Sequence, residues 1–296
     1  MSEEKKSLEN DSLYIEINRK GAELARIYDK CRKQEILWEA DPKIWGRHSP
    51  VLFPFVGKSY ENQYRLDGTI YPMGQHGFAR DMDFELMSET EKEVWYTLSD
   101  TEETREKYPF HFRLDIGYRL EGNTVRVMWK VENPSDRELY FMIGAHPGFR
   151  TPEGKTIYDF TFDFQQGGAF HYQAPNGEGY ADKEKEGVLH TEDGKVPLTP
   201  GFFKDTLTYI FDRGQIEKIG LLLDGKPFVT MECKGFPYMA LWTEEDTHPF
   251  VCLEPWYGRC AEKGFSGDLR EREGLLTLKG KESFQAEYTI RVEAAE

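Results

Sequence analysis

The sequence predicts an all-β protein built from antiparallel sheets with few short helices, and three observations support this fold class. Apolar and polar residues alternate with a period of two along much of the chain, which is typical of strands with one buried face. Asp-Gly pairs and similar turn sequences separate several of these runs, and they favour the tight turns of β-hairpins. Helical patterns are scarce, so packed sheets must form most of the core.

The alternating runs are spread along the whole chain. The clearest of them cover residues 13–17, 114–120, 125–131, 158–164 and 284–292. Three turns sit between such runs, and they predict hairpins at Asp67-Gly68, Glu121-Gly122-Asn123 and Asp224-Gly225. An Asp-Gly pair tolerates the positive φ angles that a type I′ turn requires.

The clearest helical segment is 100–108. Asp100 can cap it, Glu103 follows three residues later and Pro109 ends it, which is the order of signals expected for a short helix. The polar stretch 173–199 predicts a long surface loop. No linker rich in Pro, Ser or Gly divides the chain, so we expect a single domain over 1–296, with 1–11 as a flexible or edge segment.

Charge narrows the range of partners. The chain of 296 residues has 38 Lys and Arg against 53 Asp and Glu, a formal net charge of −15. Such a field repels phosphate backbones and anionic membranes, so we expect no nucleic acid and no membrane as a partner. A neutral sugar is indifferent to this field, whereas a sugar phosphate would require a local basic patch.

The cysteines and the N-terminal segment predict a compartment. Four cysteines occur, at positions 31, 233, 252 and 260, and none forms a CxxC pair. They are expected to be reduced, mostly structural thiols. The N-terminal segment has no apolar signal region, and no apolar run is long enough to cross a bilayer. We therefore expect a soluble, cytoplasmic protein, as a monomer or a homodimer.

Four irregular segments could carry chemistry, at 45–50, 74–80, 144–149 and 252–256. Each places a charged or proton-competent side chain among Gly, Pro and aromatic residues, which hold backbone in the irregular shapes that binding groups often use. Taken singly, each has an ordinary explanation. A loop histidine is usually solvated or structurally bonded, and this interpretation applies to His48, His111, His171, His190 and His248.

Combined, these segments resemble the motifs of the aldose 1-epimerase (galactose mutarotase) family, and most closely its LacX-like branch. The resemblance begins near Gly21-Ala22-Glu23-Leu24 and covers most of the chain. Its specific motifs are His76-Gly77-Phe78-Ala79-Arg80, His146-Pro147-Gly148-Phe149 and Leu253-Glu254-Pro255. The resemblance implies the galactose-mutarotase-like β-supersandwich fold.

The resemblance also implies roles for individual residues. His146 would be the general acid and Glu254 the general base, while Arg47 and His76 would bind sugar oxygens. For the acidic residue that binds sugar hydroxyls in the family, the best match is Asp205. Its surroundings depart from the pattern of the galactose-preferring enzymes, which leaves the sugar preference open.

The implied reaction opens and recloses a hemiacetal ring. Opening takes a proton from the anomeric O1 hydroxyl and gives one to the ring oxygen O5, so a carboxylate and an imidazolium suffice. No cofactor is needed. No metal is expected either, because His76 and His146 lie 70 residues apart without an HxH or HExxH spacing.

The sequence leaves further functions open. The protein could be a non-catalytic carbohydrate-binding or sugar-sensing protein, or a glycosidase with paired carboxylates. The substrate could be a hexose 6-phosphate held by Arg47, Arg80 and Arg259, although an ion pair of Arg80 with Asp81 or Asp83 is the preferred interpretation of that arginine. Pocket lining and core packing explain four further residues equally well: Met73, Tyr238, Trp242 and Trp256.

Overall fold

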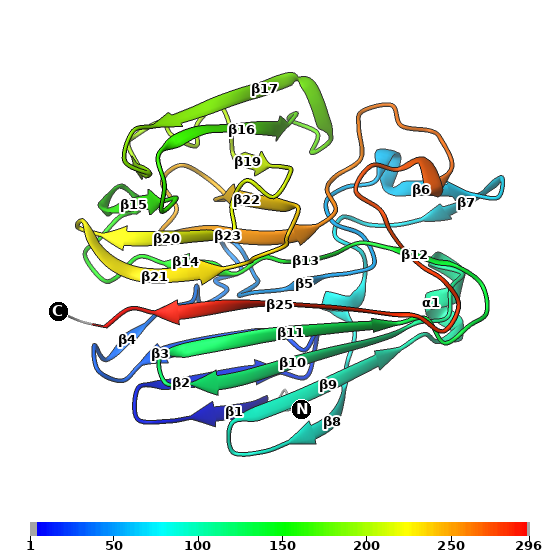
Figure 1. The fold of residues 1–296 in the computed structure, drawn as a ribbon, viewed down its shortest axis with the longest axis horizontal. Helices are drawn as coiled ribbons and strands as arrows, with labels where there is room; N and C mark the ends of the chain where they lie inside the picture. Colours follow the sequence, from blue (N-terminus) through cyan, green and yellow to red (C-terminus); the bar gives the residue numbers. More distant parts are fainter. Residues whose placement is uncertain (1–4, 295–296) are drawn as a thin grey trace.

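The computed structural model describes residues 5–294 and confirms the all-β architecture of antiparallel sheets (Figure 1). Its largest sheet has nine strands. In spatial order these are β18 (Lys195–Pro197), β15 (Phe160–Asp163), β20 (Lys218–Leu223), β21 (Lys226–Glu232), β25 (Ser283–Val292), β11 (Thr124–Glu132), β10 (Arg113–Glu121), β9 (Glu93–Ser99) and β8 (Glu85–Glu89).

An eight-stranded sheet lies above the long strands β25, β11 and β10 in Figure 1. Its order is β17 (Ala181–Thr191), β16 (Gly168–Pro175), β19 (Thr208–Phe211), β22 (Tyr238–Trp242), β23 (Phe250–Tyr257), β13 (Ile143–Ala145) and β5 (Val51–Leu52), and β14 (Gly148–Arg150) also pairs with β23.

Three smaller sheets and a few short helices complete the described residues. The sheets are formed by β1 (Lys5–Glu9), β2 (Leu13–Asn18), β3 (Leu24–Asp29) and β4 (Gln34–Glu35), by β6 (Gln63–Leu66) and β7 (Thr69–Pro72), and by β12 (Leu139–Phe141) and β24 (Leu276–Leu278). The helices are α1 (Glu102–Lys107) and the 3-10 turns η1 (Tyr60–Asn62), η2 (Ala79–Asp81), η3 (Ile157–Asp159) and η4 (Leu269–Glu271).

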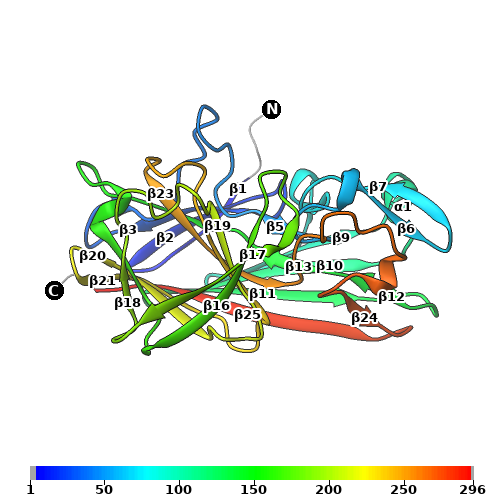
Figure 2. The same ribbon diagram turned by 90° about the horizontal axis from the view of Figure 1, so that it is seen from above.

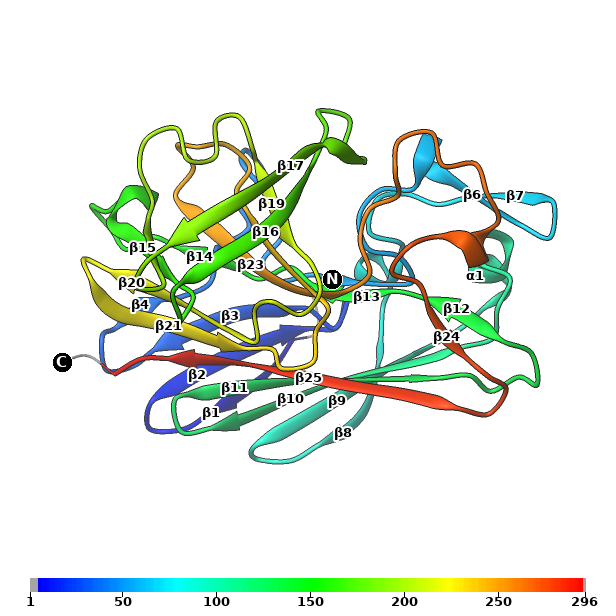
Figure 3. The same ribbon diagram turned by 45° about the horizontal axis from the view of Figure 1, so that its top comes forward.

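One hydrophobic core joins the large sheets to the four-stranded sheet. It includes Ile15 of β2, Trp129 of β11 and Leu253 of β23. The β6–β7 hairpin and α1 lie together at one end of the molecule, and the end of β25 lies at the other (Figure 2, Figure 3). The single domain over 1–296 stays a prediction. Within residues 5–294, no helix has the length and hydrophobicity of a membrane span.

The three predicted hairpins are confirmed. They join β6 to β7, β10 to β11 and β20 to β21. The turn residues of the first, Asp67 and Gly68, have φ angles of 49° and 79°, and Asp224 and Gly225 have 50° and 77°. Positive φ at both central positions is what selects Asp-Gly for such turns.

Two local predictions are wrong. Thr101, not Asp100, caps α1 in a capping box with Thr104, because the carboxylate of Asp100 accepts a hydrogen bond from the backbone N–H of Phe112 and contacts His111 instead. The stretch 173–199 is not a long loop, because most of it forms the end of β16, β17 and β18. Its polarity reflects exposure, since β17 lies at the edge of its sheet.

The N-terminal segment 1–11 was expected to be flexible or at an edge. Residues 1–4 lie outside the described part of the chain, whereas Lys5–Glu9 form β1, the outermost strand of the four-stranded sheet. β1 pairs with β2 in a continuous antiparallel register. This part of the segment is therefore an edge strand.

The position of β23 determines where a site can form. This strand lies inside the eight-stranded sheet, between β22 and β13. Seven of its eight residues are buried, and a strand covered on both faces normally reads as a continuous apolar run. Glu254 is the only acidic residue within this strand, so it requires a specific explanation.

Candidate active site

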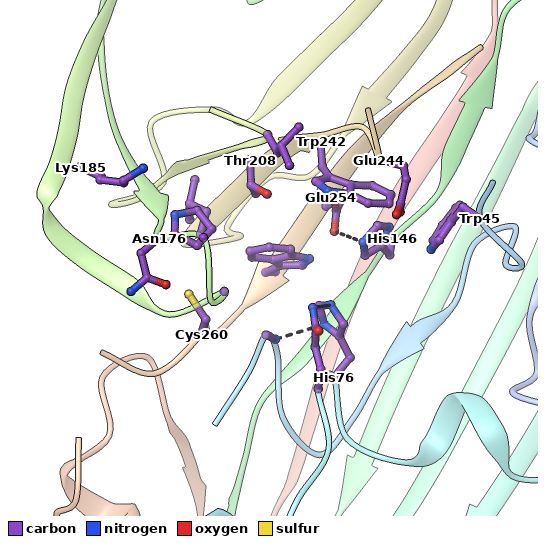
Figure 4. Close-up of a pocket in the computed structure, with 18 of the residues that line it drawn as sticks. Trp45, His76, His146, Asn176, Lys185, Thr208, Trp242, Glu244, Glu254 and Cys260 are labelled. Atoms are coloured by element: carbon purple, nitrogen blue, oxygen red, sulfur yellow. Dashed lines mark hydrogen bonds and ion pairs between the residues drawn. The ribbon is translucent and has the colours of Figure 1, made fainter. Parts of the chain in front are cut away.

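The two residues predicted to transfer protons face each other across neighbouring strands. Glu254 lies in β23, and His146 lies in the short link between β13 and β14, both of which pair with β23. Because Gly144 and Gly148 pair with positions 256 and 252, the backbone register places His146 opposite Glu254. His146 Nε2 lies 3.1 Å from Glu254 Oε2 (Figure 4). The two groups are thus in direct contact, not separated by the width of a hexose.

Burial controls the protonation of this pair. His146 is 7% exposed and Glu254 is 1% exposed. Burial raises the pKa of Glu254 well above its ordinary value. Burial, reinforced by Arg80 and Arg47, lowers the pKa of His146 to about 3. Both shifts favour a neutral carboxylic acid beside a neutral imidazole, so the proton that the two groups can exchange is favoured on Glu254.

The pair also has unused hydrogen-bonding capacity. Despite their proximity, the two side chains are not aligned for a hydrogen bond, and Glu254 Oε2 finds no partner within residues 5–294. The same is true of His146 Nδ1. Buried polar atoms are almost always hydrogen-bonded. Two unpartnered atoms in one contact pair are therefore the signature of groups available to a ligand.

His76 is held as a neutral hydrogen-bond donor. It has a left-handed φ of 65° and precedes Gly77, where a Cβ would lie 2.3 Å from the carbonyl oxygen of Phe53. The Gly57 N–H donates to His76 Nδ1 over 3.1 Å, so the ring proton resides on Nε2. The amide nitrogen of Gln75 lies 3.2 Å from Nε2, but it is also a donor and therefore cannot accept this proton. Burial lowers the pKa of His76 well below its ordinary value.

Arg47 and Arg80 form a positively charged wall beside the two histidines. Arg47 Nη2 lies 2.8 Å from Asp81 Oδ1, and Arg80 Nε lies 3.9 Å from Asp81 Oδ2. Both guanidinium groups therefore share one half-exposed carboxylate. Arg80 Nε has no hydrogen-bond partner in the described residues, and burial together with Arg47 lowers the pKa of Arg80 to about 10. The expected ion pair of Arg80 with Asp81 exists only at the limit of contact.

Aromatic rings surround His146. The ring centroid of Trp45 lies 4.9 Å from that of His146, with the planes 32° apart. Trp242 approaches to 5.0 Å at 80°, and His76 to 5.6 Å at 88°. The imidazole is thus held between two indoles, as Figure 4 shows for Trp45 and Trp242.

One cavity of about 550 Å³ gathers all five residues that the sequence predicted for the site: Arg47, His76, His146, Asp205 and Glu254. Of the four residues left open between pocket and core, Trp242 and Trp256 line this cavity, whereas Met73 and Tyr238 lie in hydrophobic clusters. Arg259 is outside the lining and forms ion pairs with Glu262 and Glu273, so it does not contribute to an anion site in this cavity.

Sequence reasoning missed several lining residues, among them Asn176, Lys185, Lys204 and Glu244. Glu244 follows β22 in a charged loop, and Figure 4 places it close to Trp45 and His146. Charged loops are common on any surface, so nothing in the local pattern distinguishes this carboxylate. The first three residues come from the stretches around β17 and β19, which carry no recognisable motif.

One group of potential metal ligands occurs within residues 5–294. The donor atoms of His146, Cys252 and Glu254 lie within 4.8 Å of one another. Burial raises the pKa of Cys252 well above its ordinary value, which disfavours the thiolate that would bind a metal. Two of the three residues are also the pair predicted to transfer protons, so a metal here would compete with that predicted role.

The fold is an antiparallel β-sandwich whose cavity holds a buried histidine and a buried glutamate in contact, and comparisons with known proteins identify its family. The sequence model of the aldose 1-epimerase family matches residues 4–264. The chain belongs to the aldose 1-epimerase family.

Individual relatives support the LacX-like resemblance. The chromosomal protein LacX of Lactococcus lactis subsp. lactis is 29% identical over 298 residues, which cover 96% of this chain and 98% of LacX. A galactose mutarotase related enzyme from Lactobacillus acidophilus has a structure that superposes with a TM-score of 0.92 at 33% identity, covering 98% of both chains. A galactose mutarotase-like protein from Lactobacillus casei gives a TM-score of 0.88 at 28% identity, over 98% of this chain and 100% of that chain.

Proposed function

We propose that this protein interconverts the α and β anomers of a hexose by acid–base ring opening and reclosure. The observation that carries the proposal is the contact between His146 and Glu254. These two groups are buried, lie 3.1 Å apart and retain unpartnered atoms at a cavity. Family membership supports a mutarotase-type activity.

The protons that His146 and Glu254 can exchange are those that ring opening and reclosure require. When a sugar enters, its hydroxyl groups become hydrogen-bond partners for Glu254 Oε2 and His146 Nδ1, the two unpartnered atoms. The proton of the Glu254 carboxyl group then moves to His146. The Glu254 carboxylate then takes the proton of the O1 hydroxyl, while the His146 imidazolium gives its proton to O5 as the C1–O5 bond breaks. Rotation about C1–C2 and the reverse transfers close the other anomer and restore both groups.

The remaining predicted residues would bind the sugar. His76 offers a neutral Nε2–H donor, and Arg47 offers guanidinium donors, so both suit sugar oxygens. Asp205, on the loop between β18 and β19, offers a carboxylate that can accept from hydroxyl groups. Each of these groups orients the ring without taking part in proton transfer, so their loss should weaken binding first.

A hexose phosphate is a second candidate substrate. It is favoured by the positively charged wall of Arg47 and Arg80. These two guanidinium groups contact the single carboxylate of Asp81, so one positive charge is left without a counter-charge from that residue. Guanidinium groups with free donors bind phosphate well. The chain as a whole has a net charge of −15, so this local excess of positive charge is the feature that would attract an anion.

Sugar binding without catalysis and glycoside hydrolysis are less well supported. A non-catalytic sugar-binding protein would not need an acid–base pair in direct contact. A glycosidase uses two carboxyl groups about 5–9.5 Å apart. Asp205 and Glu244 line the same cavity as Glu254, but the acid–base partner in contact with Glu254 is an imidazole.

Saturation-transfer NMR between the α and β anomer signals tests the proposal. Glucose, galactose and glucose 6-phosphate are compared with and without protein, and accelerated exchange is expected for at least one of them. Binding of a sugar without acceleration of its exchange would support the sugar-binding protein and overturn the mutarotase. Release of the chromophore from a chromogenic glycoside would instead support the glycosidase.

A further inference from the structure

The contacts of Trp45 suggest a role beyond lining the cavity. Its indole packs on the imidazole of His146 at 4.9 Å, and it stacks on Phe250 at 5.4 Å with the planes 11° apart. The Trp38 Nε1–H donates to the Trp45 carbonyl oxygen over 2.7 Å. Trp45 is thus held through its backbone and through its ring.

The proposed reaction requires His146 to be positively charged in a setting that opposes this charge. Burial disfavours the imidazolium, and so do Arg80 and Arg47. Of the other titratable groups near the ring, His76 and the Cys252 thiol are neutral. The acidic side chain of Glu244 also lies close to His146 in Figure 4, and it is present in every variant compared below. Glu254 favours the imidazolium, but only once it has given up its own proton.

The face of an indole attracts cations that lie within about 6 Å of the ring centroid. His146 meets this distance at Trp45, with planes inclined by 32°. Trp242 meets it as well, but its plane is inclined by 80°. The two indoles therefore offer different contacts, one close to face-to-face and one edge-to-face.

We propose that Trp45 is a positioning residue that stabilises the protonated imidazole of His146, while Trp242 fixes the rotation of that ring. This inference rests on the proposed function, since it concerns the acid of that reaction. Trp45 moves the shared proton of the His146–Glu254 pair toward the imidazole. Its contribution is largest at the moment when His146 donates to the ring oxygen.

The test compares Trp45→Leu, Trp45→Phe and Phe250→Leu in the full chain. The ¹⁵N chemical shifts of the His146 ring, followed from pH 3 to pH 7, report the fraction of imidazolium with and without sugar, and the lower end of this range lies near the pKa of about 3. We expect this fraction to fall in Trp45→Leu and to be partly rescued in Trp45→Phe, whose smaller ring still attracts cations. In the exchange assay, kcat should fall about 2- to 30-fold in Trp45→Leu, with a smaller change in KM.

Phe250→Leu is the packing control, because Phe250 contacts Trp45 but forms no ring contact with His146 among the described residues. Unchanged ¹⁵N shifts in Trp45→Leu would overturn the inference, and so would an equal change in Phe250→Leu. If the wild-type protein exchanges no sugar, the proposed function fails, and the ¹⁵N shifts still decide the role of Trp45.

Discussion

Two buried carboxyl groups, one in each large sheet, differ in how many hydrogen-bond partners surround them. Asp115 of β10 and Glu254 of β23 are both 1% exposed. Asp115 accepts from the Thr97 hydroxyl over 2.6 Å and from Arg113 Nε and Nη2 over 2.9 and 2.7 Å. Glu254 instead leaves Oε2 without a hydrogen-bond partner in the described residues, 3.1 Å from His146 Nε2.

The difference separates structural from functional burial. A buried charge is tolerated when hydrogen bonds and a counter-charge replace its lost hydration, and Asp115 meets both conditions. Glu254 meets neither condition, so burial favours its neutral form, and Oε2 is left without a hydrogen-bond partner among the described residues. Such uncompensated groups are typical of sites where a ligand completes the hydrogen bonding.

The largest expected effect is on catalysis. Glu254→Gln removes the proposed base while keeping the shape of the side chain, so anomer exchange should fall by about 10²–10⁴-fold. Sugar binding should stay measurable by ligand-observed NMR. Asp115→Asn, an equally conservative change at equal burial, is the matched control and should leave exchange unchanged. Full exchange activity in Glu254→Gln would end the assignment of Glu254 as the base.

The second effect is on stability, and here the change at Asp115 should have a large effect and the change at Glu254 a small one. Asp115→Ala leaves the Thr97 hydroxyl and Arg113 without their acceptor, so the free energy of unfolding should fall by about 1–3 kcal/mol. Chemical denaturation monitored by tryptophan fluorescence measures this change. Glu254→Gln should show no comparable loss at pH 7. Equal destabilisation by both variants would contradict the distinction between the two carboxylates.

The smallest effect is a pH dependence. Burial places the pKa of Glu254 in the folded protein well above the ordinary 4.5, so Glu254 costs stability once the pH rises above about 4.5, where the unfolded chain releases this proton. Glu254→Gln removes that cost. The variant should therefore gain stability relative to wild type between pH 4 and pH 8, by about 1.4 kcal/mol per unit of pKa shift.

Thermal unfolding at the two pH values measures this gain. Glu244→Gln changes an exposed carboxylate of the same cavity and serves as the control. A stability difference between Glu254→Gln and wild type that is the same at pH 4 and pH 8 would mean that burial does not hold this carboxyl protonated.

The regular part of the fold could be predicted because its information is local. The alternation in 114–120 and 125–131 and the turn between them specify a hairpin, and β10 and β11 pair along their full length. The partner on the other side of β11 is β25, which lies more than 150 residues further along the chain. No local pattern encodes such a pairing. The exposed edge strand β17 was missed because it lacks a buried face on which apolar residues would alternate.

The site was predicted from motifs, and the structure gives the physical reason for each one. Gly77 is needed because a side chain there would collide with Phe53. Glu254 stands out because it is the one acidic residue in the otherwise apolar, buried strand β23. The direct contact of His146 with Glu254 could not be foreseen, because it depends on the register of β13 and β14 against β23. Glu244 gave no signal, because its loop resembles any other charged loop.

That register has a consequence for how the chain length can vary. The distance between His146 and Glu254 is set by backbone pairing on both sides of His146. Since neighbouring residues of a strand point to opposite faces, deleting one residue from β23 ahead of Glu254 would turn the carboxylate away from the imidazole. Natural chains of this kind should therefore differ in length at exposed loops such as 90–92, between β8 and β9, and keep β13, β14 and β23 free of gaps.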